Sequence, residues 1–221
     1  MKAAVFDMDG LMFDTEAVFM KAWDYVGQKV GIGPAGFMVI ETLGMNLERT
    51  KQMWRDRFGG MCDEDQVTRL TYEFIDNYYD NNHVPVKKGL YNILQYLQGK
   101  GYKLAVASSS PRKDVMAHLE DADVFKYFDA VVCGDMVERS KPEPDIYLKV
   151  CDLIGESPAE CYALEDSESG LNAAIASGCK TIMVPDLWQP DDGMKKRVAA
   201  VCTDLDEVIT YIDGIDRAAT A

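Results

Sequence analysis

The sequence has few of the features that mark a membrane-spanning, secreted or zinc-binding protein. No apolar run approaches the length of about 20 residues that a membrane-spanning helix needs. The first residues, a lysine followed by a short apolar run, lack the pattern of a signal peptide. Only two histidines are present, and none of the six cysteines belongs to a C-x-x-C pair. We therefore expect a cytoplasmic protein whose thiols are reduced and mostly buried.

Positive charge is also scarce. The 221 residues include 23 lysines and arginines against 37 aspartates and glutamates, which gives a net charge of −14. Such a surface repels polyanions, so we expect neither nucleic acid nor a membrane as a partner. An anionic small molecule would need local positive charge, from a metal ion or a placed lysine, in order to bind.

The chain contains enough apolar residues for a substantial core, and it divides into two segments with different secondary-structure patterns. Residues 15–85 show only helical patterns, for example over 16–30, 47–58 and 64–81. From residue 86 onward, short apolar runs alternate with helical patterns, which is typical of a doubly wound parallel sheet. We therefore predict an α/β fold, with a core formed by residues 1–14 and 86–221 and an all-helical insertion at 15–85. The residues after Gly214 predict no regular element.

Polar residues follow three of the predicted strands, at the point where each strand ends. Asp7 and Asp9 follow the first apolar run, Ser108 to Ser110 follow residues 103–107, and Glu165 and Asp166 follow residues 161–164. In an open parallel sheet the ligand site lies at the carboxyl ends of the strands. We therefore expect these side chains to share one crevice, with Lys141 brought near it by the loop after Gly134.

The pair Asp7 and Asp9 opens this site. The apolar run ends at Gly10, which indicates a turn directly after the pair. Both aspartates can face one ligand if the chain turns at Met8-Asp9, or if one contributes its side chain and the other its backbone carbonyl. Oxygen ligands of this kind suit Mg²⁺. The alternative is a surface loop with solvated aspartates.

These residue types permit phosphoryl transfer. Asp7 is placed to attack phosphorus and form an aspartyl-phosphate, and Asp9 to act as the general acid and base. Lys141 would neutralise charge, because phosphoryl transfer depends mainly on positioning and electrostatics.

The remaining polar residues complete the predicted site. The Ser108 hydroxyl and nearby loop amides would bind phosphoryl oxygens. Mg²⁺ would be held by Asp7, the carbonyl of Asp9 and Asp166, with Glu165 as a neighbouring or alternative ligand. Each residue also has a structural alternative: the serines and the Glu165-Asp166-Ser167 segment are typical of helix caps, and a lone lysine is usually solvated.

The ordered motifs D-x-D-G, V-A-S-S-S, S-K-P-x-P-D-I-Y and L-E-D-S-x-x-G resemble those of the haloacid dehalogenase (HAD) superfamily, in its β-phosphoglucomutase-like phosphatase branch. The resemblance covers essentially the whole chain. It implies a Rossmann-like core with a helical cap, the roles just given for the site residues, and Mg²⁺ as the cofactor. Asp14-Thr15-Glu16 matches the entry to the cap in sugar-phosphate phosphatases of this branch. We therefore expect the substrate site to include Gly10, Thr15, Glu16, Ser108 and Ser109.

The chain departs from true phosphoglucomutases in the predicted cap. Phe19 stands where those enzymes have a histidine, and Phe74 lies near the position of their phosphate-binding lysine. Other cationic residues of this segment, Arg49, Lys51 and Arg55, either contact an anionic group of the substrate or are exposed helix residues. Phe19 and Trp23 either line the site or pack within the cap.

We therefore predict a Mg²⁺-dependent phosphatase acting on a small phosphorylated metabolite, a sugar or nucleoside phosphate. A phosphomutase is the alternative; a carbon–halogen hydrolase and a non-catalytic binding protein fit the motifs less well, because Asp7 and Asp9 are both present. We expect a monomer, with a dimer as the alternative.

Overall fold

The computed structural model describes residues 1–43, 45 and 47–220. Its centre is a six-stranded parallel sheet with the strand order β3-β2-β1-β4-β5-β6. The strands are β1 (Ala3–Phe6), β2 (Lys103–Ala107), β3 (Ala130–Val132), β4 (Cys161–Glu165), β5 (Lys180–Met183) and β6 (Ala200–Val201). The predicted Rossmann-like α/β fold is confirmed.

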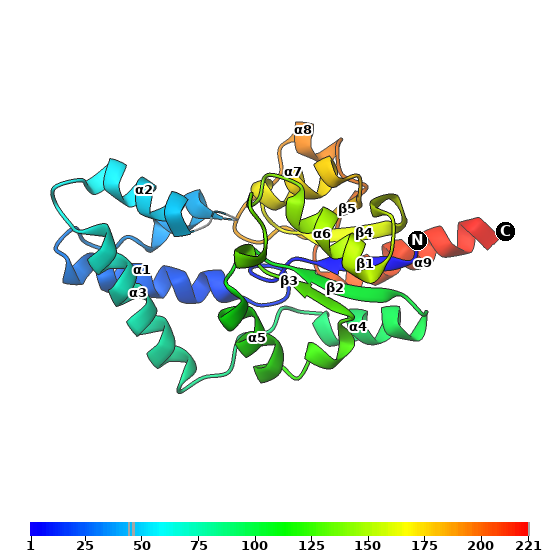
Figure 1. The fold of residues 1–221 in the computed structure, drawn as a ribbon, viewed down its shortest axis with the longest axis horizontal. Coiled ribbons are helices and arrows are strands. Elements are labelled where there is room, and N and C mark those ends of the chain that lie inside the picture. Colours follow the sequence, from blue (N-terminus) through cyan, green and yellow to red (C-terminus); the bar gives the residue numbers. More distant parts are fainter. Residues whose placement is uncertain (44, 46, 221) are drawn as a thin grey trace.

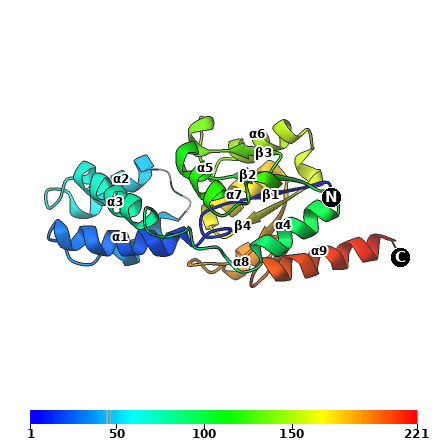
Figure 2. The same cartoon turned by 90° about the horizontal axis from the view of Figure 1, so that it is seen from below.

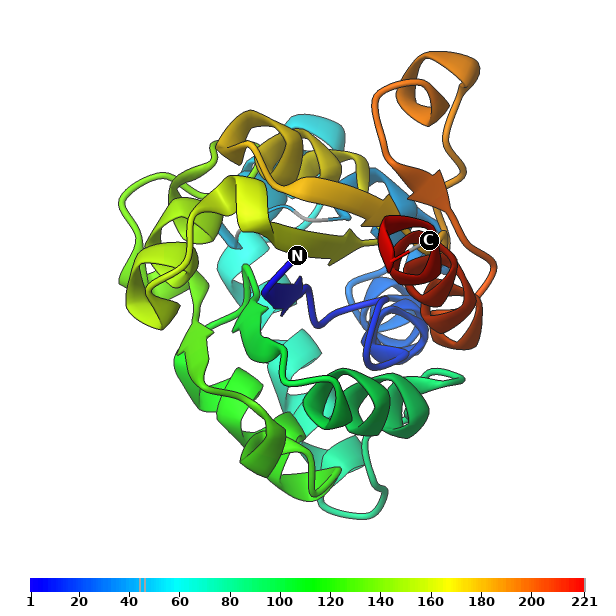
Figure 3. The same ribbon diagram turned by 90° about the vertical axis from the view of Figure 1, so that its right-hand side faces the viewer.

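The sheet is covered by helices on both faces, as Figures 2 and 3 show. Strand β1 is fully buried; Ala4 and Phe6 face one apolar cluster, and Ala3 and Val5 face the other. This is the pattern of a central strand in a parallel sheet. The first cluster includes side chains of α4 (Leu90–Gly99), α5 (Arg112–Asp121) and α9 (Leu205–Thr220); the second includes those of α6 (Asp145–Ile154) and α7 (Glu168–Ser177).

A block of helices lies beyond the carboxyl ends of the strands (Figure 1). This helical block contains α1 (Thr15–Lys29), the 3₁₀ helix η1 (Gly36–Thr42), α2 (Leu47–Phe58) and α3 (Glu64–Tyr79). It has its own apolar cluster, in which the rings of Trp23 and Trp54 meet edge to face at 5.1 Å. Leu187, from the loop after β5, packs against the same cluster. The block is therefore held together by its own packing and touches the core at a few places.

The two chain segments that join the helical block to the core lie side by side. Phe13 and Val86 form an antiparallel bridge. The Asp14 amide donates a hydrogen bond to the Pro85 carbonyl at 2.8 Å, and the Lys87 amide donates one to the Met12 carbonyl at 2.9 Å. The chain thus leaves the core and returns to it at the same point.

Some elements differ from the predicted ones. The structure adds the short helix α8 (Asp192–Lys195) and the 3₁₀ helices η2 (Phe125–Tyr127), η3 (Gly134–Met136) and η4 (Pro158–Glu160). The expectation of no regular element after Gly214 was wrong, because α9 continues to Thr220. Five of the six cysteines are buried. None of the helices that the described residues form is long and apolar enough to cross a membrane.

Candidate active site

The chain makes a tight turn directly after β1. The Gly10 amide donates to the Phe13 carbonyl at 2.8 Å, and the Met12 amide donates to the Met8 carbonyl at 2.9 Å. Gly10 has a φ of +82°, and a Cβ there would lie 2.2 Å from Asp166 Oδ2, so only glycine fits. The turn brings Asp7 and Asp9 to the same cavity, so both aspartates can face one ligand.

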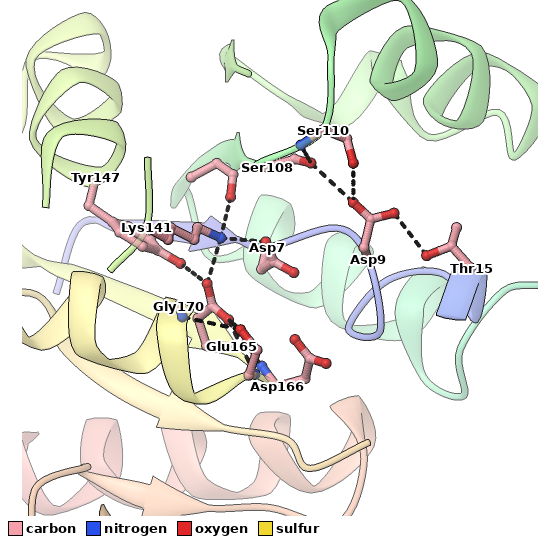
Figure 4. A network of polar contacts seen from close by, with 12 residues as sticks. Asp7, Asp9, Thr15, Ser108, Ser110, Lys141, Tyr147, Glu165, Asp166 and Gly170 are labelled. Atoms are coloured by element: carbon pink, nitrogen blue, oxygen red, sulfur yellow. Dashed lines mark hydrogen bonds and ion pairs between the residues drawn. The ribbon is translucent and has the colours of Figure 1, made fainter. Parts of the chain in front are cut away.

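Lys141 lies at the centre of a buried ionic network (Figure 4). Its Nζ donates to Asp7 Oδ1 at 2.5 Å, to Glu165 Oε1 at 2.6 Å and to the Ala107 carbonyl at 2.9 Å. The lysine is 1% exposed, so it is no solvated loop residue. Burial lowers the pKa of Lys141, but the carboxylates of Asp7 and Glu165 outweigh this and raise it above its usual value. Lys141 therefore keeps its positive charge beside Asp7.

Glu165 is fully buried and has its hydrogen-bonding capacity filled by the protein. In addition to Lys141, Oε1 accepts from the Tyr147 hydroxyl at 2.5 Å, while Oε2 accepts from the Asp166 amide at 3.2 Å and from Ser167 Oγ at 3.3 Å. A Cβ on Gly170 would lie 2.0 Å from Glu165 Oε1, which explains the glycine in L-E-D-S-x-x-G. We did not single out Tyr147 from the sequence, although it closes the S-K-P-x-P-D-I-Y motif.

Three carboxylates could hold a metal ion. Ligand atoms of Asp7, Glu165 and Asp166 lie within 4.8 Å of one another. Burial and the charge of Glu165 raise the pKa of Asp7 to about 8, and burial and the charge of Asp7 raise that of Asp166 well above its usual value. Asp166 Oδ1 is buried and has no hydrogen-bond partner among the described residues. A hard divalent cation fits this donor set, because it would compensate the buried charge and give that oxygen a partner.

The Asp9 carboxylate points away from this cluster and contacts hydroxyl groups (Figure 4). Oδ2 accepts from Ser110 Oγ at 2.8 Å and from Ser108 Oγ at 3.2 Å, and Oδ1 accepts from Thr15 Oγ1 at 2.8 Å. Ser110 was expected in this crevice as part of the run of three serines, but its contact with Asp9 was not predicted. Since Thr15 begins α1, Asp9 joins the core to the helical block.

A cavity of about 400 Å³ lies between the carboxyl ends of the strands and the helical block. Of the predicted residues, Asp7, Asp9, Glu16, Ser109 and Asp166 line it. Four further predicted residues do not line the cavity but contact the aspartates through the hydrogen bonds described above. Thr15 and Ser108 contact Asp9, Lys141 contacts Asp7, and Glu165 contacts the Asp166 amide. Burial, followed by the charges of Asp9 and Asp7, raises the pKa of Glu16 well above its usual value.

Phe19 and Trp23 combine the two alternatives that the sequence left open. Both line the cavity, and both pack in the apolar cluster of the helical block. The aromatic rings thus form part of the cavity wall and of the packing that holds that wall in place.

Comparison with known proteins identifies the family of the chain and supports its fold. Residues 4–184 match the haloacid dehalogenase-like hydrolase family. The putative phosphatase YhcW of Bacillus subtilis is 31% identical over 84% of both chains, and the phosphorylated carbohydrates phosphatase of Thermotoga maritima is 29% identical over 82% of this chain and 84% of that protein. The crystal structure of a putative β-phosphoglucomutase from T. maritima has a TM-score of 0.79 at 24% identity, covering 97% of this chain and all of that one. The chain belongs to the haloacid dehalogenase-like hydrolase family and is an enzyme of that family.

Proposed function

We propose that the protein is a Mg²⁺-dependent phosphatase that hydrolyses a small phosphorylated metabolite, a sugar or nucleoside phosphate, through an aspartyl-phosphate intermediate. The observation that carries the proposal is the Asp7 carboxylate at the cavity wall, 2.5 Å from the buried ammonium of Lys141. The names of the two curated relatives, both described as phosphatases, support the same activity.

Asp7 is the nucleophile of the proposed reaction. One of its carboxylate oxygens attacks phosphorus, and the bond from phosphorus to the leaving-group oxygen breaks. Lys141 holds Asp7 in place and offsets part of the negative charge that gathers when a phosphate approaches a carboxylate. Ser109 Oγ, which lines the cavity and has no hydrogen-bond partner among the described residues, is available to donate to a phosphoryl oxygen.

Asp9 is the proposed general acid and base. It donates a proton to the leaving-group oxygen as that bond breaks. It then takes a proton from the water that attacks the aspartyl-phosphate, which releases phosphate and restores Asp7. The hydroxyls of Thr15, Ser108 and Ser110 hold Asp9 in its present position, so these residues position the acid.

The metal site of the proposal uses Asp7, Asp166 and the backbone carbonyl of Asp9. When bound there, Mg²⁺ would neutralise negative charge on the phosphoryl group and on the carboxylates around it. Glu165, whose oxygens already accept from Lys141, Tyr147 and Ser167, positions the lysine and the Asp166 backbone.

The helical block is the proposed cap, inserted at residues 15–85. Its two connections to the core are paired through Phe13 and Val86, and a small change of backbone angles there would move the whole block. Closure would exclude bulk water from the cavity during phosphoryl transfer.

We expect Mg²⁺ to stabilise the folded protein, and to do so more strongly at about pH 8 than at about pH 6. The pKa of Asp7 is raised from 3.8 to about 8 by burial and by Glu165, so between these values the folded, metal-free protein binds a proton that the unfolded chain releases. Its free energy of unfolding therefore falls as the pH rises through this window. Mg²⁺ has to displace that proton, and the displacement is easier at the higher pH.

Urea unfolding with EDTA or with Mg²⁺ measures this effect. At a free Mg²⁺ concentration of about 100 times its Kd, the gain in free energy of unfolding should be about 2.7 kcal/mol. The matched variant Asp166→Asn should lose most of the gain. An equal gain in Asp166→Asn and in the wild type would contradict the proposed ligand set.

Release of inorganic phosphate from a panel of sugar, nucleoside and small-acid monophosphates tests the activity. We expect metal-dependent release that EDTA stops. Conversion of β-glucose 1-phosphate to glucose 6-phosphate without free phosphate would favour the phosphomutase instead. Phosphate release from none of these compounds or from p-nitrophenyl phosphate would contradict the proposed function.

A further inference from the structure

The cavity wall beyond the phosphoryl site has no cationic side chain among the described residues. The charged residues that line the cavity are all acidic: Asp7, Asp9, Glu16, Asp135, Glu138 and Asp166. Lys141 is the nearby cation of the site, and it is already paired with Asp7 and Glu165. A second anionic group on the substrate would thus meet like charge rather than a partner.

The cations of the helical block are engaged elsewhere. Lys51 pairs with Asp65 at 2.9 Å and Arg55 with Glu64 at 2.8 Å, both across the contact between α2 and α3. Arg49 lines a separate depression, together with Arg57 and Asp56. The sequence left open whether Arg49, Lys51 and Arg55 contact an anionic substrate group, and none of the three lines the cavity.

Phe74, near the position of the phosphate-binding lysine of phosphoglucomutases, lies away from the cavity. Its ring packs against Tyr25 at a centroid distance of 5.3 Å, and it belongs to the apolar cluster between α1 and α3. It does not line the cavity.

The uncharged polar groups of the wall include acceptors, on three threonines, and two donors without a hydrogen-bond partner among the described residues, Trp54 Nε1 and Ser109 Oγ. Thr42, Thr68 and Thr71 each donate their hydroxyl proton to a backbone carbonyl of their own helix, at 2.9, 2.7 and 2.8 Å. Their oxygen lone pairs remain, and a hydroxyl oxygen without a free proton can only accept. Carboxylates also accept when ionised. The complementary ligand therefore carries hydroxyl groups, which donate to the threonine and carboxylate oxygens and accept from Trp54 Nε1 and Ser109 Oγ.

Aromatic and aliphatic side chains complete the wall. Phe19, Trp23, Val39, Trp54 and Val67 line it from the helical block. A cavity that combines apolar surface, several acceptors and acidic residues fits a molecule with hydroxyl groups on an uncharged carbon skeleton.

We propose that the cavity selects a polyhydroxylated, uncharged leaving group that carries a single phosphate, and rejects substrates with a second phosphate or a carboxylate. A sugar or polyol monophosphate has this chemistry. This inference rests on the proposed phosphatase function and narrows its substrate class.

Matched pairs of substrates test the selection. Glucose 6-phosphate is compared with 6-phosphogluconate, fructose 6-phosphate with fructose 1,6-bisphosphate, and glycerol 3-phosphate with 3-phosphoglycerate. We expect the member with a single phosphate and no other charge to have a kcat/KM about 100-fold higher in each pair, because the second anionic group of the other member would be buried without a partner. Uridine monophosphate, with a base in place of most hydroxyls, should also be a poorer substrate than the best sugar phosphate.

A charge placed in the wall should relax the selection. Thr68 lines the cavity and is half-buried, whereas Gln66 on the same helix is exposed and does not line it. Thr68→Lys should raise the kcat/KM for fructose 1,6-bisphosphate relative to fructose 6-phosphate about 10-fold. Thr68→Met, of similar length without charge, and Gln66→Lys, with the charge outside the cavity, should leave the ratio unchanged.

The outcomes separate the inference from the function on which it rests. If the substrates with a second anionic group are hydrolysed as well as those with a single phosphate, or if uridine monophosphate is the best substrate, the inference is wrong while the phosphatase function stands. If p-nitrophenyl phosphate and all the monophosphates remain intact, the proposed function itself has failed. Should Thr68→Lys fold poorly, which circular dichroism would show, the wild-type pairs alone decide.

Discussion

Replacing Asp7 by asparagine should lower phosphate release at least about 10⁴-fold, since an amide cannot act as the nucleophile and no covalent intermediate can form. The fold should survive the change. An asparagine oxygen can still accept from Lys141, which keeps Glu165 as its second partner. Removal of one carboxylate from a buried cluster of three also relieves repulsion between like charges. We therefore expect a melting temperature equal to or higher than that of the wild type.

Rapid acid quench followed by mass spectrometry of the intact protein distinguishes the role of Asp7 from that of Asp9. The wild type should carry one phosphoryl group during turnover, and Asp7→Asn none. Asp9→Asn keeps the nucleophile and loses the acid, so it should retain more activity than Asp7→Asn, about 10²- to 10⁴-fold below the wild type. A phosphorylated Asp7→Asn protein would show that another residue is the nucleophile.

Replacing Lys141 by methionine should lower the free energy of unfolding by about 3–5 kcal/mol and reduce phosphate release as well. Methionine fills the space of the lysine stem but leaves two carboxylates, those of Asp7 and Glu165, buried without their counter-ion. Breaking a buried ion pair from one side has an effect of this size because the remaining charge is not compensated.

A double-mutant cycle with Glu165→Gln separates the stability effect from the catalytic one. In Lys141→Met/Glu165→Gln one of the two orphaned charges is gone, so part of the stability should return. Activity should not return, because the cation beside Asp7 is still missing. The matched control is Lys149→Met on α6, whose lysine is exposed, and its stability in urea should stay within about 0.5 kcal/mol of the wild type. A Lys141→Met protein as stable as this control would contradict the network as described.

The convergence of the site could be predicted because it follows from topology. Parallel strands end at one edge of the sheet, so Asp7, Ser108 and Asp166 had to lie near one another once β1, β2 and β4 were recognised. The motifs also indicated that Lys141 serves this site.

The side-chain partners of individual residues within the motifs could not be predicted in the same way. That Ser110 and Thr15 hold Asp9 depends on side-chain directions within a turn and a helix start, which spacing alone does not determine. The burial of the Tyr147 hydroxyl against Glu165 depends on how α6 packs on the sheet. Tertiary contacts of this kind are not encoded in local periodicity.

The length of α9 shows a similar limit. The residues after Gly214 predicted no regular element, and a glycine in a helix interior lowers helix propensity. In the structure the helix continues past the glycine, and the neighbouring Asp213 accepts a hydrogen bond from Tyr96 of α4 and pairs with Lys100 and, one turn along α9, with Arg217. Contacts with α4, which the local sequence does not show, thus accompany the continuation of the helix.

The pairing of the two connecting segments has a consequence for how such a protein can diversify. Because residues 12–14 and 85–87 are hydrogen-bonded to each other, an insertion of any length that begins and ends at this point leaves the sheet and its strand order undisturbed. Mutations in the helical block can reshape the wall around Phe19, Thr68 and Trp54 while Asp7 and Lys141 stay where the core holds them. Evolution can therefore exchange one specificity for another without rebuilding the chemistry.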